Sequence, residues 1–303
     1  MLSLLQLLPP ELAHELTLRL LPLVSRLMGD LSTYESLADH DGMGQKLFGR
    51  YFTHPFGMAA GFDKNGVVPR PLMRFGFSFV EVGTVTPETQ AGNPQPRLFR
   101  LRREQGVINR MGFPSQGMVA VKANLEKMID VEWQSYKNRA LQASSHGTES
   151  IAAGFAAMEK KIKAQRQGLG VDSSWLWPCP LLVNVGINKH TETPLDDFAK
   201  VARALAPLAT AVVVNVSSPN TAGLRALQSR DNLINIINKI RKITPKPLLL
   251  KLSPDLSHAQ VLDLATFCIA EKIDGVILTN TTVSRFGVER SRHRDEAGGL
   301  SGR

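Results

Sequence analysis

The chain has 303 residues, of which 43% are hydrophobic and 21% charged, a composition that excludes a disordered segment and supplies a large core. Its two cysteines exclude a disulfide framework and fit a reducing compartment. The formal net charge of +9 favours anionic partners, but the sequence has no helix-turn-helix, zinc-finger or RNA-binding signature. We therefore expect anionic small ligands or a lipid surface as partners, and no nucleic acid.

Leucine dominates the first 28 residues of the chain. This segment predicts two short amphipathic helices with a kink at Pro22, because prolines and charged residues interrupt the apolar run. No run approaches the roughly 20 apolar residues that cross a bilayer, and no cleavable signal peptide is recognisable. From the residues alone, three roles remain open: a membrane surface, a partner contact and a core helix.

Six short apolar segments, alternating with helical patterns, predict parallel strands covered by helices. The expected strands are 56–60, 79–84, 181–186, 211–214, 247–252 and 275–279, with a hairpin through 106–108. The expected helices are 113–128, 194–205 capped by Thr193, 231–242 and 257–271. This pattern predicts an α/β fold of the TIM (β/α)8-barrel type. It is incomplete, with about six strand–helix units where eight close a barrel.

The segment 213–225 begins as a strand and ends as a polar loop containing Ser218. Pro219 fixes φ and removes a hydrogen-bond donor, so the strand cannot continue through the loop. Reactive groups of α/β barrels lie at this kind of strand-to-loop junction. The alternative is an ordinary turn rich in Ser, Asn and Pro.

Two lysines stand out beside these strands. Lys251 lies inside an apolar strand, where a charge is costly unless an anion or a dipole compensates it. Lys64 follows the small residues of segment 59–66, which let a planar ring come close to the backbone. Asn109 and Gly112 beside Phe113 suit a pocket for a small polar ring. A solvated lysine after a tight turn is the alternative for Lys64.

The Asn-x-Ser-Ser-Pro-Asn-Thr motif at 215–221, the run 83–113 and the segment 59–66 together resemble class 2 dihydroorotate dehydrogenases, which are quinone-dependent and contain FMN. The resemblance implies oxidation of dihydroorotate to orotate in pyrimidine (UMP) biosynthesis. Ser218 would be the catalytic base that takes the C5 proton while the C6 hydride passes to flavin N5. Class 1 enzymes carry a cysteine at this position, whereas Cys179 and Cys268 of this chain lie elsewhere.

The same resemblance implies roles for other residues, and it implies no metal. It places Lys251 beside the flavin N1/O2 edge, where a cation stabilises the reduced, anionic ring. The implied substrate-binding residues are Lys64, Asn109, Arg110, Met111, Gly112, Phe113, Asn215, Asn220, Asn280 and Thr281. The implied FMN-binding residues are Ala60, Gly61, Phe62, Asp63, Lys64, Thr84, Asn184, Asn215, Lys251, Thr279 and Gly302.

The resemblance also implies a domain organisation. Residues 1–30 would form an amphipathic helical segment that touches the membrane and admits quinone. Residues 45–303 would form the FMN-binding barrel, interrupted by an insertion at 130–180. We expect peripheral association with the cytoplasmic face of a bacterial inner membrane, because no arginine-rich, acid-poor transit peptide precedes Leu2.

Two other functions stay open at this stage. One is another flavin-dependent pyrimidine oxidoreductase of related barrel type. The other is an inactive, truncated remnant without flavin, because the loops after strands seven and eight, which the family uses to hold the FMN phosphate, are not in the sequence. The insertion would be a surface feature, or else a partner or membrane contact through its basic face at 160–166 and its tryptophans, Trp175 and Trp177.

Overall fold

The computed structural model describes residues 5, 7–27, 42–143, 154–160, 172–221 and 223–302. The helices are α2 (Pro10–Leu27), α4 (Pro69–Arg74), α5 (Gly117–Ala143), α7 (Pro194–Leu205), α8 (Arg230–Arg241) and α9 (His258–Ala270), with a helical segment at 154–160 and short 3-10 turns at Ser174–Leu176, Ala206–Leu208 and Leu224–Gln228. The strands are β1 (Gln45–Leu47), β2 (Arg50–Phe52), β3 (Val80–Val85), β4 (Leu98–Leu101), β5 (Gly106–Asn109), β6 (Leu181–Val185), β7 (Ala211–Asn215), β8 (Leu248–Leu252), β9 (Gly275–Leu278) and β10 (Gly299–Gly302).

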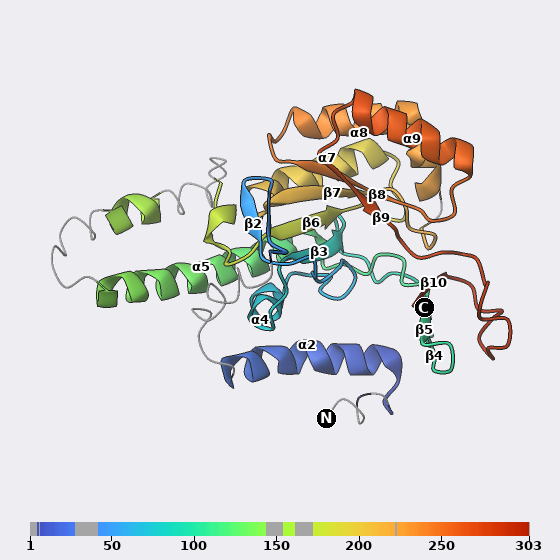
Figure 1. Cartoon of the computed structure of the whole chain (residues 1–303), viewed down its shortest axis with the longest axis horizontal. Helices are drawn as coiled ribbons and strands as arrows, with labels where there is room; N and C mark the ends of the chain where they lie inside the picture. Colours follow the sequence, from blue (N-terminus) through green and yellow to red (C-terminus); the bar gives the residue numbers. More distant parts are fainter. Residues whose placement is uncertain are drawn as a thin grey trace.

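A five-stranded parallel sheet forms the centre of the molecule. Its strand order is β3-β6-β7-β8-β9, and Met58 extends it past β3 through a single parallel bridge to Val80. Helices α7, α8 and α9 lie along one side of this sheet (Figure 1). The repeated strand–helix order confirms the predicted α/β barrel class, but the sheet does not close into a barrel within the described ranges.

Side-chain alternation gives this sheet two different faces. Val212 and Val214 of β7 point to the helices and belong to the large core. Val213 and Leu249 point to the opposite, inner face, where they form a separate apolar cluster. Asn215 follows on that inner face at the end of β7. The inner face thus changes from apolar to polar toward the carboxyl ends of the strands, which is where the cavity lies.

Two small antiparallel sheets flank the parallel one. The β1–β2 hairpin, which the sequence patterns did not predict, contributes Phe48 and Phe52, and the Phe52 ring contacts Phe79 at a centroid distance of 5.7 Å. The other sheet has the order β10-β5-β4, and it contains the hairpin that was predicted through 106–108. In Figure 1 this second sheet lies beside the end of the parallel strands.

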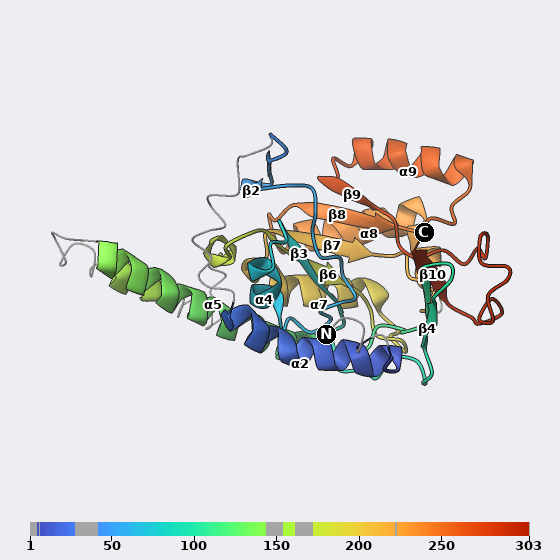
Figure 2. The same cartoon turned by 60° about the horizontal axis from the view of Figure 1, so that its bottom comes forward.

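Helix α2 is one continuous helix with Pro22 inside it. The first of the two helices expected in the segment 2–28 lies mostly outside the described residues. Helix α2 lies apart from the parallel sheet, along α4 and the β4 hairpin (Figure 2). Its outer surface exposes leucines, including Leu12 at 50%, Leu23 at 59% and Leu27 at 87%. None of the helices in the described part of the chain is long and apolar enough to cross a membrane.

Helix α2 is attached to the rest of the molecule by polar contacts. The Nε2 atom of His14 lies 2.7 Å from the carbonyl oxygen of Phe62. Arg97 donates from Nη2 and Nε to the Oε1 atom of Glu11, at 2.5 and 2.9 Å. These contacts place α2 beside the segment that follows Met58.

Three sequence expectations are corrected by the fold. The strand expected at 56–60 is reduced to the single bridge at Met58, with Pro55 and Gly57 nearby as poor strand formers. The helix expected to end near residue 128 continues to Ala143. Thr193 precedes α7 as expected, but its side chain makes no capping hydrogen bond.

The segment 130–180, expected as an insertion, contributes to the core. Trp133 and Trp177 are 3% and 1% exposed, and the indole Nε1 of Trp177 donates to the carbonyl oxygen of Leu208 at 2.8 Å. Trp175 is exposed at 42%. Of the basic face expected at 160–166, only Lys160 lies within the described residues.

Candidate active site

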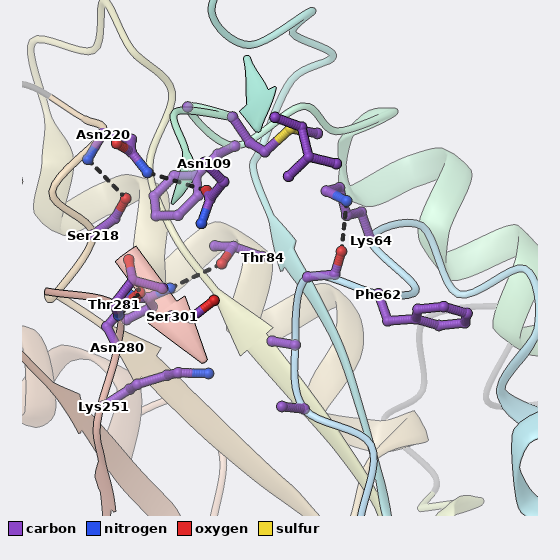
Figure 3. Close-up of a pocket in the computed structure, with 18 of the residues that line it drawn as sticks. Phe62, Lys64, Thr84, Asn109, Ser218, Asn220, Lys251, Asn280, Thr281 and Ser301 are labelled. Atoms are coloured by element: carbon purple, nitrogen blue, oxygen red, sulfur yellow. Dashed lines mark hydrogen bonds between the residues drawn. The ribbon is translucent and has the colours of Figure 1, made fainter. Parts of the chain in front are cut away.

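A cavity of about 740 Å³ opens at the carboxyl ends of the parallel strands. Side chains from the segment after Met58, from β3, β7 and β8, and from the loops after them converge there (Figure 3). The sequence-predicted residues that line it are Ala60, Gly61, Phe62, Lys64, Thr84, Asn109, Met111, Gly112, Phe113, Asn215, Ser218, Asn220, Lys251, Thr279, Asn280, Thr281 and Gly302. Strand ends of a parallel sheet share one edge, which brings together residues that are far apart in sequence.

Ser218 lies in the loop after β7 and is 5% exposed. Its Oγ atom accepts a hydrogen bond from the backbone N–H of Asn220 at 3.2 Å. The Nδ2 atom of Asn220 donates in turn to Oδ1 of Asn109 at 3.3 Å, which joins this loop to the end of β5. The hydroxyl is therefore fixed beside two amide side chains at the cavity wall (Figure 3).

Asn215 is the centre of a buried polar network. Its Nδ2 atom donates to Oγ1 of Thr84 at 2.9 Å and to Oδ1 of Asn184 at 3.2 Å. Its Oδ1 atom accepts from Ser217, from the backbone N–H at 3.2 Å and from the hydroxyl at 2.8 Å. Asn280 donates to the same Ser217 hydroxyl at 3.0 Å. The network thus holds the ends of β3, β6, β7 and β9 in a fixed arrangement.

Arg225 ties the loop that carries Ser218 to the loop after β9. Its Nε donates to the carbonyl oxygen of Ser217 at 3.2 Å, and its Nη2 to that of Thr281 at 3.4 Å. Its Nη1 lies 3.0 Å from Oδ2 of Asp255. Burial raises the pKa of Asp255, but hydrogen bonds from Thr282 and Val283 and the guanidinium of Arg225 outweigh burial and leave that pKa below its usual value.

Lys64 approaches the cavity on the side of α2. Its ammonium donates to the carbonyl oxygen of Gly61 at 2.5 Å. Burial, and then the positive charge of Arg97, lower the pKa of Lys64 to about 8, although Glu11 and Asp63 oppose the change. An anion bound beside this ammonium would stabilise its charged form.

Lys251 approaches the cavity from β8 and meets a buried carboxylate. Its Nζ lies 3.3 Å from Oε2 of Glu81 on β3, and the two side chains are 9% and 4% exposed. A buried lysine needs an anion to compensate its charge, and Glu81 supplies part of that compensation.

Three residues expected in the site do not line the cavity. Arg110 turns away, pairing with Glu296 at 2.6 Å and lying over a phenylalanine ring. The carboxylate of Asp63 accepts from the backbone N–H groups of Val67 and Val68, and burial raises its pKa. Asn184 lies behind the wall in the Asn215 network.

Sequence reasoning missed several residues that line the cavity, among them Glu11 and His14 of α2. Their spacing of three residues puts them on the same face of a helix, and that spacing was the available signal. Burial lowers the pKa of His14, and the positive charge of Lys64 lowers it further. The cavity therefore reaches from the strand ends to the N-terminal helix.

The fold and the site define an enzyme of the α/β-barrel class, with its polar groups gathered at the carboxyl ends of the strands. A sequence model described as dihydroorotate dehydrogenase matches residues 43–303. The chain belongs to the dihydroorotate dehydrogenase family, and the curated relatives reported below are named as quinone-dependent enzymes.

Among these relatives, the dihydroorotate dehydrogenase (quinone) of Rhodospirillum rubrum is 41% identical over 97% of this chain and 68% of its own length. The mitochondrial enzyme of Arabidopsis thaliana is 38% identical over 98% of this chain and 61% of its own length. The structure of the Eimeria tenella enzyme in complex with ferulenol has a TM-score of 0.75 at 33% identity, covering 97% of this chain and 72% of that one. These matches confirm the resemblance and the fold class predicted from the sequence.

Proposed function

We propose that this chain oxidises dihydroorotate to orotate with FMN as cofactor and a quinone as electron acceptor, in the synthesis of pyrimidine nucleotides. The observation that supports this most directly is the set of groups around one cavity: a buried serine hydroxyl, amide side chains and two lysines. Amides suit a pyrimidine ring because its own groups alternate between donors and acceptors. The family match supports the reaction type.

Residues around the cavity fit the ring system of a flavin. Ala59, Ala60 and Gly61 form a wall with little side-chain volume, against which a planar ring can lie. Thr84 and Lys251 supply a hydroxyl and a cation to the edges of such a ring. When bound, FMN supplies the hydride-accepting chemistry of the reaction.

In this mechanism Ser218 removes the C5 proton of the substrate. A serine hydroxyl is a weak base, so it needs a relay that carries the proton away. Thr221, three residues further along the same loop, has a buried Oγ1 atom with no hydrogen-bond partner among the described residues. Its hydroxyl is available for such a relay.

The same proposal gives the remaining polar groups a binding role. We assign the amides of Asn109, Asn220 and Asn280 to the ring and the carboxylate of the substrate. Asn215 would join them by exchanging one of its network partners for the substrate, because its amide already makes four hydrogen bonds. Lys64 faces the same cavity and supplies a positive charge for that carboxylate.

We also propose that α2 connects the cavity to a membrane. Its exposed leucines form an apolar outer surface, while Glu11 and His14 on its inner side line the cavity. A quinone dissolved in the lipid would then reach the flavin past this helix. The proposed location is peripheral, on the cytoplasmic face of a bacterial inner membrane.

Binding of the orotate anion is expected to depend on the charge of Lys64. Because its pKa is about 8, the ammonium is the main form below pH 8 and is lost above it. We expect the Kd of orotate to stay level below pH 8, and then to rise by up to about tenfold per pH unit. Titration of orotate against the FMN-loaded chain between pH 6.5 and 10 measures this.

The matched control is Lys64→Arg, because a guanidinium keeps its charge throughout this pH range. The rise in Kd should be absent in that variant. An equal rise in both proteins would assign the pH dependence to another group.

A comparison of electron acceptors tests the proposal that a quinone reoxidises the flavin. Turnover of dihydroorotate is measured with a short-chain ubiquinone, fumarate and NAD+ in parallel, in detergent. We expect quinone to support the fastest turnover. Faster turnover with fumarate or NAD+ would point to another flavin-dependent pyrimidine oxidoreductase.

A further inference from the structure

Glu81 is a buried carboxylate that the proposed reaction does not use. It lies at the second position of β3, between Val80 and Val82, and is 3% exposed. A charge in such a position is costly unless it is paired and hydrogen-bonded. It is not among the residues that line the cavity, but it lies directly behind Lys251, which does.

Three donors meet the two oxygens of Glu81. Asn184 donates from Nδ2 to Oε1 at 2.6 Å. The backbone N–H of Ala60 and the ammonium of Lys251 both donate to Oε2, at 3.0 and 3.3 Å. The carboxylate therefore connects β3 with β6, β8 and the segment that begins the cofactor wall.

A neutral amide cannot replace this carboxylate. The Oδ1 atom of Asn184 already accepts from Thr84 at 2.6 Å, which fixes its Nδ2 toward Glu81. Glutamine at position 81 would therefore turn its NH2 group toward one of the donors. All three donors are satisfied only if both terminal atoms of the side chain are acceptors. A carboxylate meets this condition and an amide does not, which is a chemical reason for an acidic residue here.

We propose that Glu81 is a positioning residue that holds the ammonium of Lys251 at the cavity wall and moderates its charge toward the cofactor. This inference rests on the proposed FMN site. With Glu81 ionised, the pair presents little net charge, so the reduced, anionic flavin is stabilised only in part. Removal of the carboxylate leaves the full positive charge of Lys251 beside the flavin.

Anaerobic dye titration of the FMN-loaded chain measures this effect as a reduction potential. We expect Glu81→Gln to raise the equilibrium constant for flavin reduction by about tenfold, which is about 30 mV for a two-electron couple. Glu81→Asp keeps the negative charge, so its reduction potential should be closer to that of the unchanged protein. Glu88→Gln is the matched control, because Glu88 is an exposed carboxylate in the loop after β3.

A double-mutant cycle separates this role from a purely structural one. If Glu81 acts through Lys251, then Glu81→Met should change the potential in the natural background but not in a Lys251→Met background. The same change in both backgrounds would overturn the inference, as would an unchanged potential in Glu81→Gln. If the single Glu81 variants do not fold, Lys251→Met and the double variant still test the inference: equal potentials are expected, and different potentials would overturn it.

The flavin-free chain provides a second, independent test. Removing one partner of a buried pair leaves an uncompensated charge, whereas removing both does not. The melting temperature should fall in Glu81→Met and in Lys251→Met. The double variant should have a higher melting temperature than either single variant. Additive losses would overturn the pairing. Failure of the unchanged chain to hold FMN would instead count against the proposed function, and this thermal test would remain valid.

Discussion

Ser218→Ala is expected to lower the turnover of dihydroorotate by about 10²- to 10⁴-fold, because it removes the proposed base at the cavity wall. FMN binding should be unchanged, since the known contacts of the Ser218 side chain are confined to its own loop. Rapid mixing of the oxidised, FMN-loaded chain with dihydroorotate measures the rate at which the flavin band bleaches.

An exposed serine supplies the control for this experiment. Ser284 lies in the loop after β9 and is not part of the cavity wall. The flavin band of Ser284→Ala should therefore bleach at the same rate as that of the unchanged chain. Loss of bound flavin in Ser218→Ala would contradict the assignment, because it would make Ser218 a cofactor-holding residue. Turnover within a few-fold of the unchanged chain would exclude Ser218 as the base.

Asn215→Ala is expected to have the largest effect on stability among the polar residues of the site. It leaves the backbone N–H and the hydroxyl of Ser217 without their acceptor, and it removes the donor to Thr84 and Asn184. Each orphaned buried group costs about 1–3 kcal/mol, so we expect a loss of about 2–5 kcal/mol in the free energy of unfolding. Urea unfolding of the flavin-free chain, followed by circular dichroism, measures this loss.

Asn238→Ala is the matched control, because Asn238 is exposed on α8. It should change the free energy of unfolding by less than about 0.5 kcal/mol. An equally small change for Asn215→Ala would mean that water replaces the lost partners, and that the network does not fix the strand ends.

The strands of the parallel sheet were predictable because each has a simple apolar pattern. The runs at β6, β7 and β8 are buried on both faces, and both faces are apolar over most of their length. The strand expected around Met58 is reduced to a single bridge. Pro55 and Gly57, which are poor strand formers, lie beside it. Local patterns therefore located the element but overestimated its length.

The N-terminal helix and the tryptophans show what local patterns leave out. Pro22 was expected to kink the N-terminal helix, and α2 extends over Pro10–Leu27 with this proline inside it. Trp177 was considered as part of a partner or membrane contact on the expected insertion, yet it is buried and its indole donates a hydrogen bond to the carbonyl oxygen of Leu208. The burial of Trp177 involves a contact with a segment 31 residues away, which a short sequence window does not contain.

Most of the site could be predicted because parallel strands end at one edge. Asn215 ends β7, Ser218 follows the same strand and Lys251 lies near the end of the adjacent strand β8, and the structure brings all three to one cavity. Glu81 was missed, although Lys251 carried the signal by requiring an anion. The two residues are 170 positions apart, so nothing local in the sequence pairs them.

The most direct test of the account is the visible absorption spectrum of the purified chain, after addition of FMN and desalting, before and after anaerobic addition of dihydroorotate. The account predicts a retained flavin band that dihydroorotate bleaches and a quinone restores. Absence of a retained band, or a band that dihydroorotate leaves unchanged, would contradict the proposal that this cavity holds FMN and oxidises dihydroorotate.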